Sequence, residues 1–254
     1  MRKRIPAAFL AFLALIAAGC THHQQPRKIS IAAAADLQFA LAEAGRQFHQ
    51  QHPETELQIN YGSSGSFDTQ IRNGAPFDVF LSADIEFPRR LAQDGLVRAD
   101  SLFVYGAGRL AVWVPAASPL DPATALHNPS VRRIAIANPL HAPYGRAAEA
   151  ALRQMGLWES VQKKLVLGEN ISQTLQFVQS GAADVGMVAL SLAIAPTVKS
   201  QGRYWEVPLD AYPKMEQGGA IVKDSPAARE FRAWLLAPEG RRLLKQYGFF
   251  LPGE

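Results

Sequence analysis

The sequence predicts an α/β protein of two lobes, each built on a mostly parallel sheet flanked by helices. Short apolar runs alternate along the chain with segments in which apolar residues recur at helical spacing, the pattern of strands joined by helices. A loop at 115–129, rich in Pro, Ala and Asp, interrupts the pattern, which then resumes. About 235 residues follow the N-terminal leader, enough for two small domains.

The N-terminus has the layout of a secretory signal peptide over residues 1–19. Three basic residues precede an apolar run at 5–18, which is shorter than the roughly 18 to 20 residues of a membrane-spanning helix. Small residues then lead to Cys20, the only cysteine of the chain, which excludes an internal disulfide. We interpret Cys20 as a lipid-attachment site; the alternative is cleavage and release, because Ala17 stands where Leu is usual.

Residues 20–27 are polar and are expected to tether the fold to the membrane. The tether contains His22 and His23, but no further ligand follows at metal-site spacing, so we expect no bound metal ion there. The net charge of +4 includes three basic residues of the leader. The remainder is nearly neutral and has no basic stripe, so nucleic acid and an anionic membrane surface are not expected partners.

Lobe 1 is expected to comprise residues 28–107 and 218–254. Its first helix follows Asp36, the expected N-cap, and its apolar residues recur at helical spacing from Leu37 to Phe48. The last two helices begin with Pro226 and Pro238, whose missing N–H costs nothing in a first turn. The expected strands are 29–34, 57–61, 78–81 and 220–222, and the expected helices are 37–51, 67–72, 85–93, 226–236 and 238–246.

Lobe 2 is expected to comprise residues 108–217, with crossings between the lobes near 106–109 and 216–219. Asn170 and Gln173 have the spacing of a capping box before a buried stripe that starts at Ile171. The expected strands are 109–114, 133–137, 165–167 and 185–188, and the expected helices are 146–155 and 172–180.

Four junctions between a strand and a helix carry small or hydroxyl residues, at 34–36, 62–66, 142–145 and 169–172. Ligands of open α/β sheets bind outside the carboxyl ends of the strands, and a helix N-terminus offers free N–H groups and partial positive charge. The junctions therefore predict a cradle for an anion. Ser64 is the first candidate and Ser63 the second, although the same loop could be a plain turn with an N-cap serine.

Tyr144 lies between Pro and Gly in an expected loop, where its hydroxyl either faces a ligand or packs on the surface.

A hydrolase is the rival class of protein, because residues 62–66 look like a nucleophile elbow around Ser64. The elbow requires Gly in its fifth place, where this chain has Ser66, and His141 beside a proline-containing loop is a weak candidate base. No catalytic triad is visible in the sequence.

Several segments in this order resemble the bacterial molybdate-binding proteins that serve ABC transporters. The resemblance covers nearly all of the chain after the leader, and its carriers are 31–37 (IAAAADL), 61–65 (YGSSG), 73–84 (NGAPFDVFLSAD), 138–145 and 247–249. It implies a type II periplasmic binding protein fold with the ligand cleft between the lobes. It also implies a periplasmic protein, monomeric and not an enzyme, that delivers its ligand to an ABC transporter permease.

In such proteins the oxyanion is held by serine and tyrosine hydroxyls and backbone N–H groups, without a cofactor, a bare metal cation or a salt bridge. The resemblance therefore implies molybdate, and with it tungstate, as ligand. When the family's ligand-binding positions are placed on this sequence, the serine of the second strand-to-helix loop is Ser64 and the third loop contributes Tyr144. A backbone N–H donor falls on Ile171. The remaining alternatives are another small anion or solute, and a sensor with the same cleft.

The chain departs from this family at two places. Asp36 stands where many members have Ser, and Ala189 stands where a tyrosine follows the last strand. A carboxylate facing a dianion would repel it. We therefore expect Asp36 to turn back and cap its own helix, which leaves the N–H groups of Ala35 and Asp36 for the ligand while Tyr144 supplies the phenol.

Overall fold

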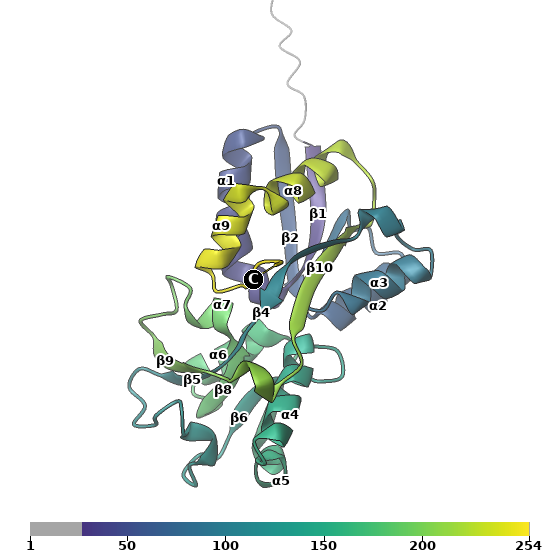
Figure 1. The fold of residues 1–254 in the computed structure, drawn as a ribbon. Coiled ribbons are helices and arrows are strands. Elements are labelled where there is room, and N and C mark those ends of the chain that lie inside the picture. Colours follow the sequence, from purple (N-terminus) through teal and green to yellow (C-terminus); the bar gives the residue numbers. More distant parts are fainter. Residues whose placement is uncertain (1–26, 254) are drawn as a thin grey trace, which may run out of the picture.

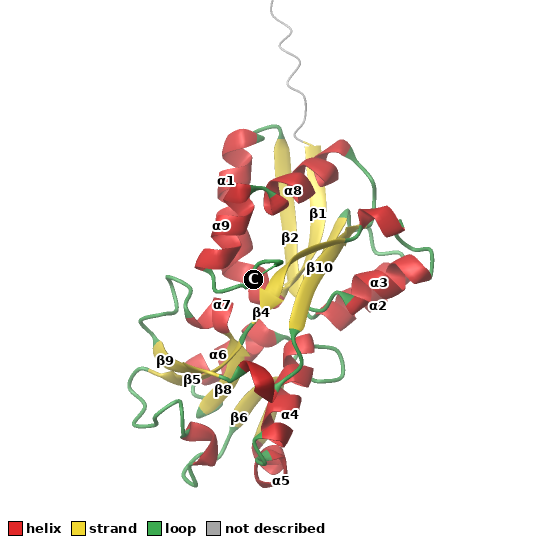
Figure 2. Cartoon of the chain, in the orientation of Figure 1, coloured by secondary structure: helices red, strands yellow, loops and turns green. Residues whose placement is uncertain are grey.

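The computed structural model describes residues 27–253 and shows two α/β lobes, one above the other in Figure 1. Each lobe contains one five-stranded sheet, seen in yellow in Figure 2. The sheet of lobe 1 has the order β2-β1-β3-β10-β4, with β1 (Arg27–Ala34), β2 (Thr55–Gly62), β3 (Val79–Ser82), β4 (Phe103–Gly108) and β10 (Met215–Ile221). The sheet of lobe 2 has the order β7-β6-β8-β5-β9, with β5 (Leu110–Pro115), β6 (Ile134–Ala137), β7 (Leu165–Gly168), β8 (Val185–Ala189) and β9 (Gly202–Glu206).

Helices cover both faces of the lobe 1 sheet, because alternate side chains of its central strands are apolar on both sides. Ile31 and Ala33 of β1 pack in one core with α1 (Gln38–Gln51), α8 (Pro226–Leu236) and α9 (Pro238–Gln246). Ala32 points the other way and packs in a second core with α2 (Ser64–Arg72) and α3 (Glu86–Gln93). Figure 1 shows these two groups of helices on opposite sides of the sheet.

Lobe 2 has one large apolar core around β5, β6 and β8, whose residues are almost all buried. The helices of this lobe are α4 (Pro143–Gln154), α5 (Trp158–Val161), α6 (Ile171–Gln179) and α7 (Leu190–Ala193). Short 3-10 turns join several elements, and one of them, Ala35–Leu37, links β1 to α1. This turn brings Asp36 to the boundary between the lobes.

Both sheets are mixed, whereas the sequence predicted mostly parallel sheets. In lobe 1, β1 is parallel to β2 and β3, but β10 is antiparallel to β3 and β4. In lobe 2, β6 is parallel to β7 and β8, but β5 is antiparallel to β8 and β9. The reversal has a simple cause. β5 and β10 are the strands that enter each lobe from the other lobe, so they run opposite to strands that point toward the lobe boundary.

Several elements differ from their predicted bounds. β4 and β9 were not predicted, and β10 begins at Met215, so the expected lobe boundary at residue 218 lies inside this strand. α2 and α4 each begin three residues before the predicted start. Tyr144 therefore lies in the first turn of a helix and not in a loop, because Pro143 at the first helical position is compatible with the helix.

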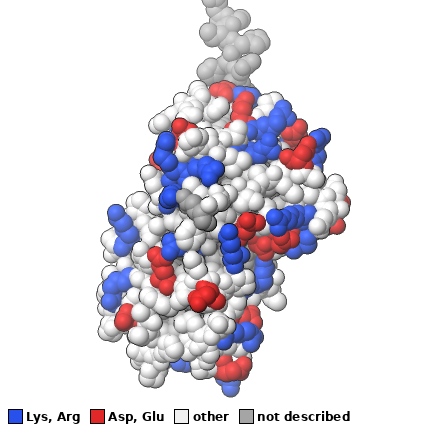
Figure 3. Space-filling model, viewed as in Figure 1, with Lys and Arg blue, Asp and Glu red and all other residues white. Residues whose placement is uncertain are grey.

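The expected signal peptide at 1–19, Cys20 and the pair His22 and His23 lie outside the described residues. Within residues 27–253 no helix combines the length and the apolar character that crossing a membrane requires. Basic and acidic side chains are interspersed over the face of the molecule shown in Figure 3, with no continuous basic stripe on that face.

Candidate functional site

A small cavity lies where the carboxyl ends of the parallel strands of both lobes face each other. All six residues singled out from the sequence line it: Ala35, Asp36, Ser63, Ser64, Tyr144 and Ile171. Its remaining walls are Ala34, Gly62, Ala83, Ala142 and Pro143, so none of the described residues that line it is Lys or Arg. Its free volume is about 10 Å³, roughly the room that the centre of one water molecule needs.

Lobe 1 contributes the two serines at the start of α2. Ser63 is the N-cap, and its Oγ accepts a hydrogen bond from the Ser66 N–H (3.3 Å). Ser64 is the first helical residue and is fully buried, and its Oγ accepts from the Ala83 N–H (3.0 Å). Because a hydroxyl both donates and accepts, Ser64 keeps its own hydrogen for a group in the cavity.

Lobe 2 contributes the first turns of α4 and α6. Asn170 caps α6 with its side chain, which accepts from the Gln173 N–H (3.0 Å), and Gln173 in turn accepts from the Glu169 N–H (2.6 Å). The predicted capping role of Asn170 is thus confirmed. Ile171 follows directly as the first helical residue, where backbone N–H groups have no partner inside the helix.

Asp36 is buried, with 1% of its surface exposed, and its carboxylate belongs to a hydrogen-bond network. Its Oδ2 accepts from the Tyr144 hydroxyl (3.0 Å) and from Gln217 Nε2 (2.7 Å). Tyr105 extends the network by donating to Gln217 Oε1 (3.0 Å). Burial raises the pKa of Asp36 to about 6, although the hydrogen bonds from Gln217 and Tyr144 act in the opposite direction.

The expectation that Asp36 caps its own helix is wrong. No side chain caps either the 3-10 turn or α1, and the Asp36 carboxylate turns to Tyr144 and Gln217 instead. The reason is geometric: the 3-10 turn places Asp36 inside a helical segment and not before it. The hydroxyl hydrogen of Tyr144 is directed to Asp36, so in this state it is not available to a ligand.

The two lobes contact each other directly around the cavity. Gly65 N donates to the His141 carbonyl (2.9 Å), and Ser63 Oγ lies 2.9 Å from His141 Nδ1. A Cβ at Gly65 would lie 2.6 Å from that carbonyl, so this glycine serves the contact between the lobes. On the other side of the cavity, Ser172 Oγ donates to the Ala35 carbonyl (3.0 Å) and Ser191 Oγ to the Asp36 carbonyl (2.7 Å). The structure is therefore a closed state of the two lobes.

The rival hydrolase prediction centred on Ser64 has no support in this geometry, because the Ser64 Oγ contacts a backbone N–H and not a histidine. The serine beside His141 is Ser63, and Glu169 lies 3.5 Å from His141 Nε2. Ser63, His141 and Glu169 lie in the order of a Ser-His-acid catalytic triad. However, the Ser63 hydroxyl caps α2 and the Glu169 side chain is 63% exposed, unlike the buried acid of such a triad. The contact spans the two lobes and holds them together.

The sequence did not reveal Gln217 and Tyr105, which do not line the cavity but belong to the hydrogen-bond network that holds Asp36. Both are buried and both come from strands at the crossing between the lobes, β10 and β4. The only hint in the sequence was Gln217 itself, a polar residue that stands before Gly218 and Gly219 at the start of an apolar segment. Ala189, at the position of the missing family tyrosine, ends β8 and is fully buried, but it does not line the cavity.

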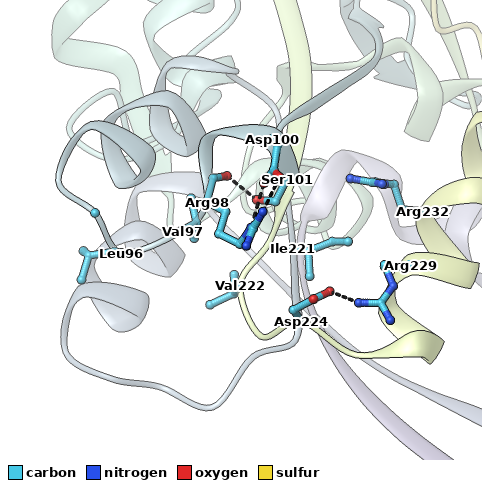
Figure 4. Close-up of a pocket in the computed structure, with 11 residues that line it drawn as sticks. Leu96, Val97, Arg98, Asp100, Ser101, Ile221, Val222, Asp224, Arg229 and Arg232 are labelled. Atoms are coloured by element: carbon cyan, nitrogen blue, oxygen red, sulfur yellow. Dashed lines mark hydrogen bonds and ion pairs between the residues drawn. The ribbon is translucent and has the colours of Figure 1, made fainter.

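A larger hollow of about 390 Å³ lies at the opposite end of the lobe 1 sheet (Figure 4). Two of the three arginines that line it are paired with acidic neighbours: Arg98 donates to Asp100 (2.9 Å) and Arg229 to Asp224 (2.6 Å). Ile221 and Val222 line it at the amino-terminal end of β3, far from the strand ends that carry ligands in such sheets. The small cavity between the lobes is the stronger candidate site.

The cavity gathers the N-terminal turns of α2, α4 and α6 and two serine hydroxyls, and no cationic side chain of residues 27–253 lines it. Such neutral donors and helix N-termini are suited to an anion, since each N–H group and each helix end is partly positive. The comparisons with known proteins agree with this geometry. A family model described as bacterial extracellular solute-binding protein matches residues 29–250. The chain belongs to this family of solute-binding proteins.

Two relatives and one solved structure illustrate the family. The molybdate-binding protein of Azotobacter vinelandii is 36% identical over 89% of this chain and 91% of its own length. A solved structure of the Azotobacter vinelandii periplasmic molybdate-binding protein has a TM-score of 0.82, with 32% identity over 88% of this chain and 99% of that one. A Bacillus subtilis protein, provisionally named ABC transporter substrate-binding lipoprotein, is 31% identical over 96% of this chain and 95% of its own length. These findings confirm the two-lobed binding-protein fold.

Proposed function

We propose that this solute-binding protein holds molybdate, as a tetrahedral dianion, in the cavity between its lobes and delivers it to an ABC transporter permease. The observation that carries the proposal is the convergence of three helix N-termini and the buried Ser64 on one cavity, whose lining in the described part of the chain contains no Lys or Arg. The relatives named for molybdate support the choice of ligand. Tungstate, with the same charge and nearly the same size, is proposed as a second ligand.

The proposed ligand-binding residues are Ala35, Asp36, Ser63, Ser64, Tyr144 and Ile171. The first turns of α2 and α6 and the 3-10 turn at Asp36 supply backbone N–H groups, and Ser64 supplies a hydroxyl. Because these groups come from both lobes, an anion that contacts them favours the closed state. Closure then presents one combined surface of both lobes to the permease, and no covalent chemistry is involved.

We also propose that the protein acts as a monomer in the periplasm and is anchored to the membrane by a lipid at Cys20. The name of the Bacillus subtilis relative supports a lipid anchor in this family. Mass spectrometry of the protein from a membrane fraction tests this: a diacylglyceryl group on Cys20 is expected, and a free N-terminus after residue 20 contradicts it.

Isothermal titration with molybdate, tungstate, sulfate and phosphate, each in turn, tests the proposed ligand. Molybdate and tungstate are expected to bind with one site per chain, and each should raise the melting temperature, because a ligand of the folded state stabilises it. Binding of sulfate or phosphate alone would assign the site to another oxyanion. Binding of none of the four would contradict the proposal.

A further inference from the structure

The Asp36 carboxylate presents a conflict inside the proposed anion site. Its Oδ2 is held by Tyr144 and Gln217, whereas its Oδ1 is buried and has no hydrogen-bond partner among residues 27–253. Asp36 also lines the cavity. An ionised, unpaired carboxylate oxygen in a dry site is costly, and its cost rises when a second anion is brought beside it.

A proton removes the conflict. An anion oxygen and Oδ1 are both acceptors, and they attract each other only when one hydrogen lies between them. We propose that Asp36 couples anion binding to proton uptake, so that one proton is bound with each dianion and is shared between Asp36 Oδ1 and an anion oxygen. This inference rests on the proposed function and adds a specificity-determining role for Asp36.

The network around Asp36 is consistent with a neutral side chain. Tyr144 and Gln217 both donate to Oδ2, which leaves Oδ1 as the atom to carry the proton. Burial raises the pKa of Asp36 to about 6, so the carboxyl group takes up a proton close to neutral pH. No further rearrangement of the network is needed, because the partners of Oδ2 remain donors.

The other titratable groups near the site do not replace Asp36 in this role. Burial raises the pKa of Tyr105 and of Tyr144 well above the ordinary value, and it raises that of Tyr61 to about 12, so these phenols stay neutral. The Tyr212 hydroxyl accepts a hydrogen bond from the Leu110 N–H (3.0 Å), and burial raises the pKa of this phenol as well. His141 and Glu169 lie at the edge of the cavity and contact Ser63 and Ser66.

Proton coupling predicts how affinity depends on pH. Molybdate is fully ionised near neutral pH, so the proton comes from solvent. In the ligand-free protein Asp36 is mostly ionised above pH 6, so binding of the anion requires uptake of a proton from solvent. Each further pH unit then weakens the binding of molybdate by about tenfold. Between pH 6 and pH 8 the dissociation constant should rise roughly fifty-fold, and proton uptake should rise from about one half to about one proton per anion.

The experiment is titration of the purified protein with molybdate at pH 6, 7 and 8, in two buffers of different ionisation enthalpy. The observed heat changes with the ionisation enthalpy of the buffer, and the size of this change gives the number of protons taken up per bound anion. Asp36→Asn is expected to bind without proton uptake, with an affinity that is constant over this range and tighter than that of the wild type at pH 8. In Asn the amide nitrogen supplies a permanent donor in place of the shared proton.

Two control variants separate Asp36 from other groups. Asp94→Asn changes a half-exposed aspartate far from the cavity, and His141→Gln removes the titratable side chain at its edge. Asp94→Asn should keep both the wild-type affinity and the wild-type pH slope. His141→Gln also removes a contact between the lobes, so its affinity is expected to fall, but its pH slope should stay that of the wild type. Wild-type binding with no proton uptake, or an unchanged slope in Asp36→Asn, would overturn the inference alone. Failure of molybdate to bind at pH 6 would overturn the proposed function and this inference together.

Discussion

Asp36 carries the largest electrostatic cost among the residues of the site. Its burial removes the carboxylate from water, and among the described residues the side-chain donors that replace the lost hydration are Tyr144 and Gln217, both neutral. An ionised carboxylate also repels a dianion that is bound beside it. Its presence therefore links the stability of the free protein and the affinity for the ligand to the same proton.

The first prediction concerns stability. The folded-state pKa of Asp36, about 6, is above its ordinary value of 3.8, so ionisation destabilises the fold. This cost is absent below pH 3.8, grows as pH rises to 6, and is complete above pH 6, where it reaches about 3 kcal/mol. Asp36→Asn should therefore gain stability over the wild type at pH 8 and little at pH 4. Denaturant unfolding at both pH values measures this, and an equal difference at both would contradict it.

The second prediction concerns Ser64. Its hydroxyl is buried and free to donate into the cavity, so Ser64→Ala should weaken molybdate binding by about 1 to 3 kcal/mol. The variant also leaves the Ala83 N–H without its acceptor, so some loss of folding stability is expected as well. Calorimetry at a temperature well below unfolding separates the two effects. Unchanged affinity would remove Ser64 from the site.

At the scale of elements, the site depends on where helices begin. α2, α4 and α6 start at Ser64, Pro143 and Ile171, and each start faces the same cavity. Ser63 and Asn170 cap two of them with side-chain oxygens, which leaves other first-turn N–H groups for a ligand. The glycine after Ser64 allows α2 to approach lobe 2.

The third prediction tests that approach. In Gly65→Ala the new Cβ would lie 2.6 Å from the His141 carbonyl and 2.9 Å from the His141 Cα, and backbone atoms relieve such a clash only if the lobes separate. We expect affinity for molybdate to fall by about tenfold or more, with little change in the stability of the ligand-free protein. Equilibrium titration and thermal unfolding measure the two quantities.

Gly45→Ala is the matched control for this variant. Gly45 lies within α1, and a Cβ there meets only a Leu57 methyl group at 3.9 Å. Affinity should be unchanged, and stability should rise by about 0.5 to 1 kcal/mol because Ala is the better helix residue. A loss of affinity in both variants, or in neither, would contradict the role of Gly65 in closure.

At the scale of the whole molecule, two lobes joined by crossing strands meet through a small set of polar contacts. Arg146 of α4 pairs with Asp84 of lobe 1 at 2.7 Å, next to a groove between the lobes of about 330 Å³. The contacts of Ser172 and Ser191 to lobe 1 are hydrogen bonds as well. Contacts of this kind are each worth little, so the ligand is expected to decide between open and closed states.

The fourth prediction is that molybdate changes the shape of the molecule. Small-angle scattering should give a larger radius of gyration for the ligand-free protein than for the saturated one, because the lobes separate when the bridging anion is absent. Asp94→Asn, whose surface position is remote from the lobe boundary, should behave as the wild type. Equal radii with and without bound molybdate would show that closure does not depend on the anion.

Most of the strand and helix pattern and the cap of α6 could be predicted from local sequence, whereas the expected cap at Asp36 was wrong. Apolar spacing located β1, β6 and α1, and the polar N-cap at Asn170 follows from local hydrogen bonding. β4 and β9 were missed, because strands broken by glycine or exposed along one side lack a clear period. The direction of β10 was also invisible, since it depends on how the chain returns from lobe 2.

The sequence was sufficient to predict two α/β lobes from periodicity. The strand-to-helix junctions, together with the resemblance to molybdate-binding proteins, brought into one candidate site Ala35, Asp36, Ser63, Ser64, Tyr144 and Ile171. The partners of Asp36 were decided only by tertiary structure. Tyr144 and Gln217 are 108 and 181 residues away from it along the chain, and they meet it where the two lobes close. A side chain can cap its own helix or join a distant network, and only the three-dimensional arrangement of donors determines which hydrogen bonds form.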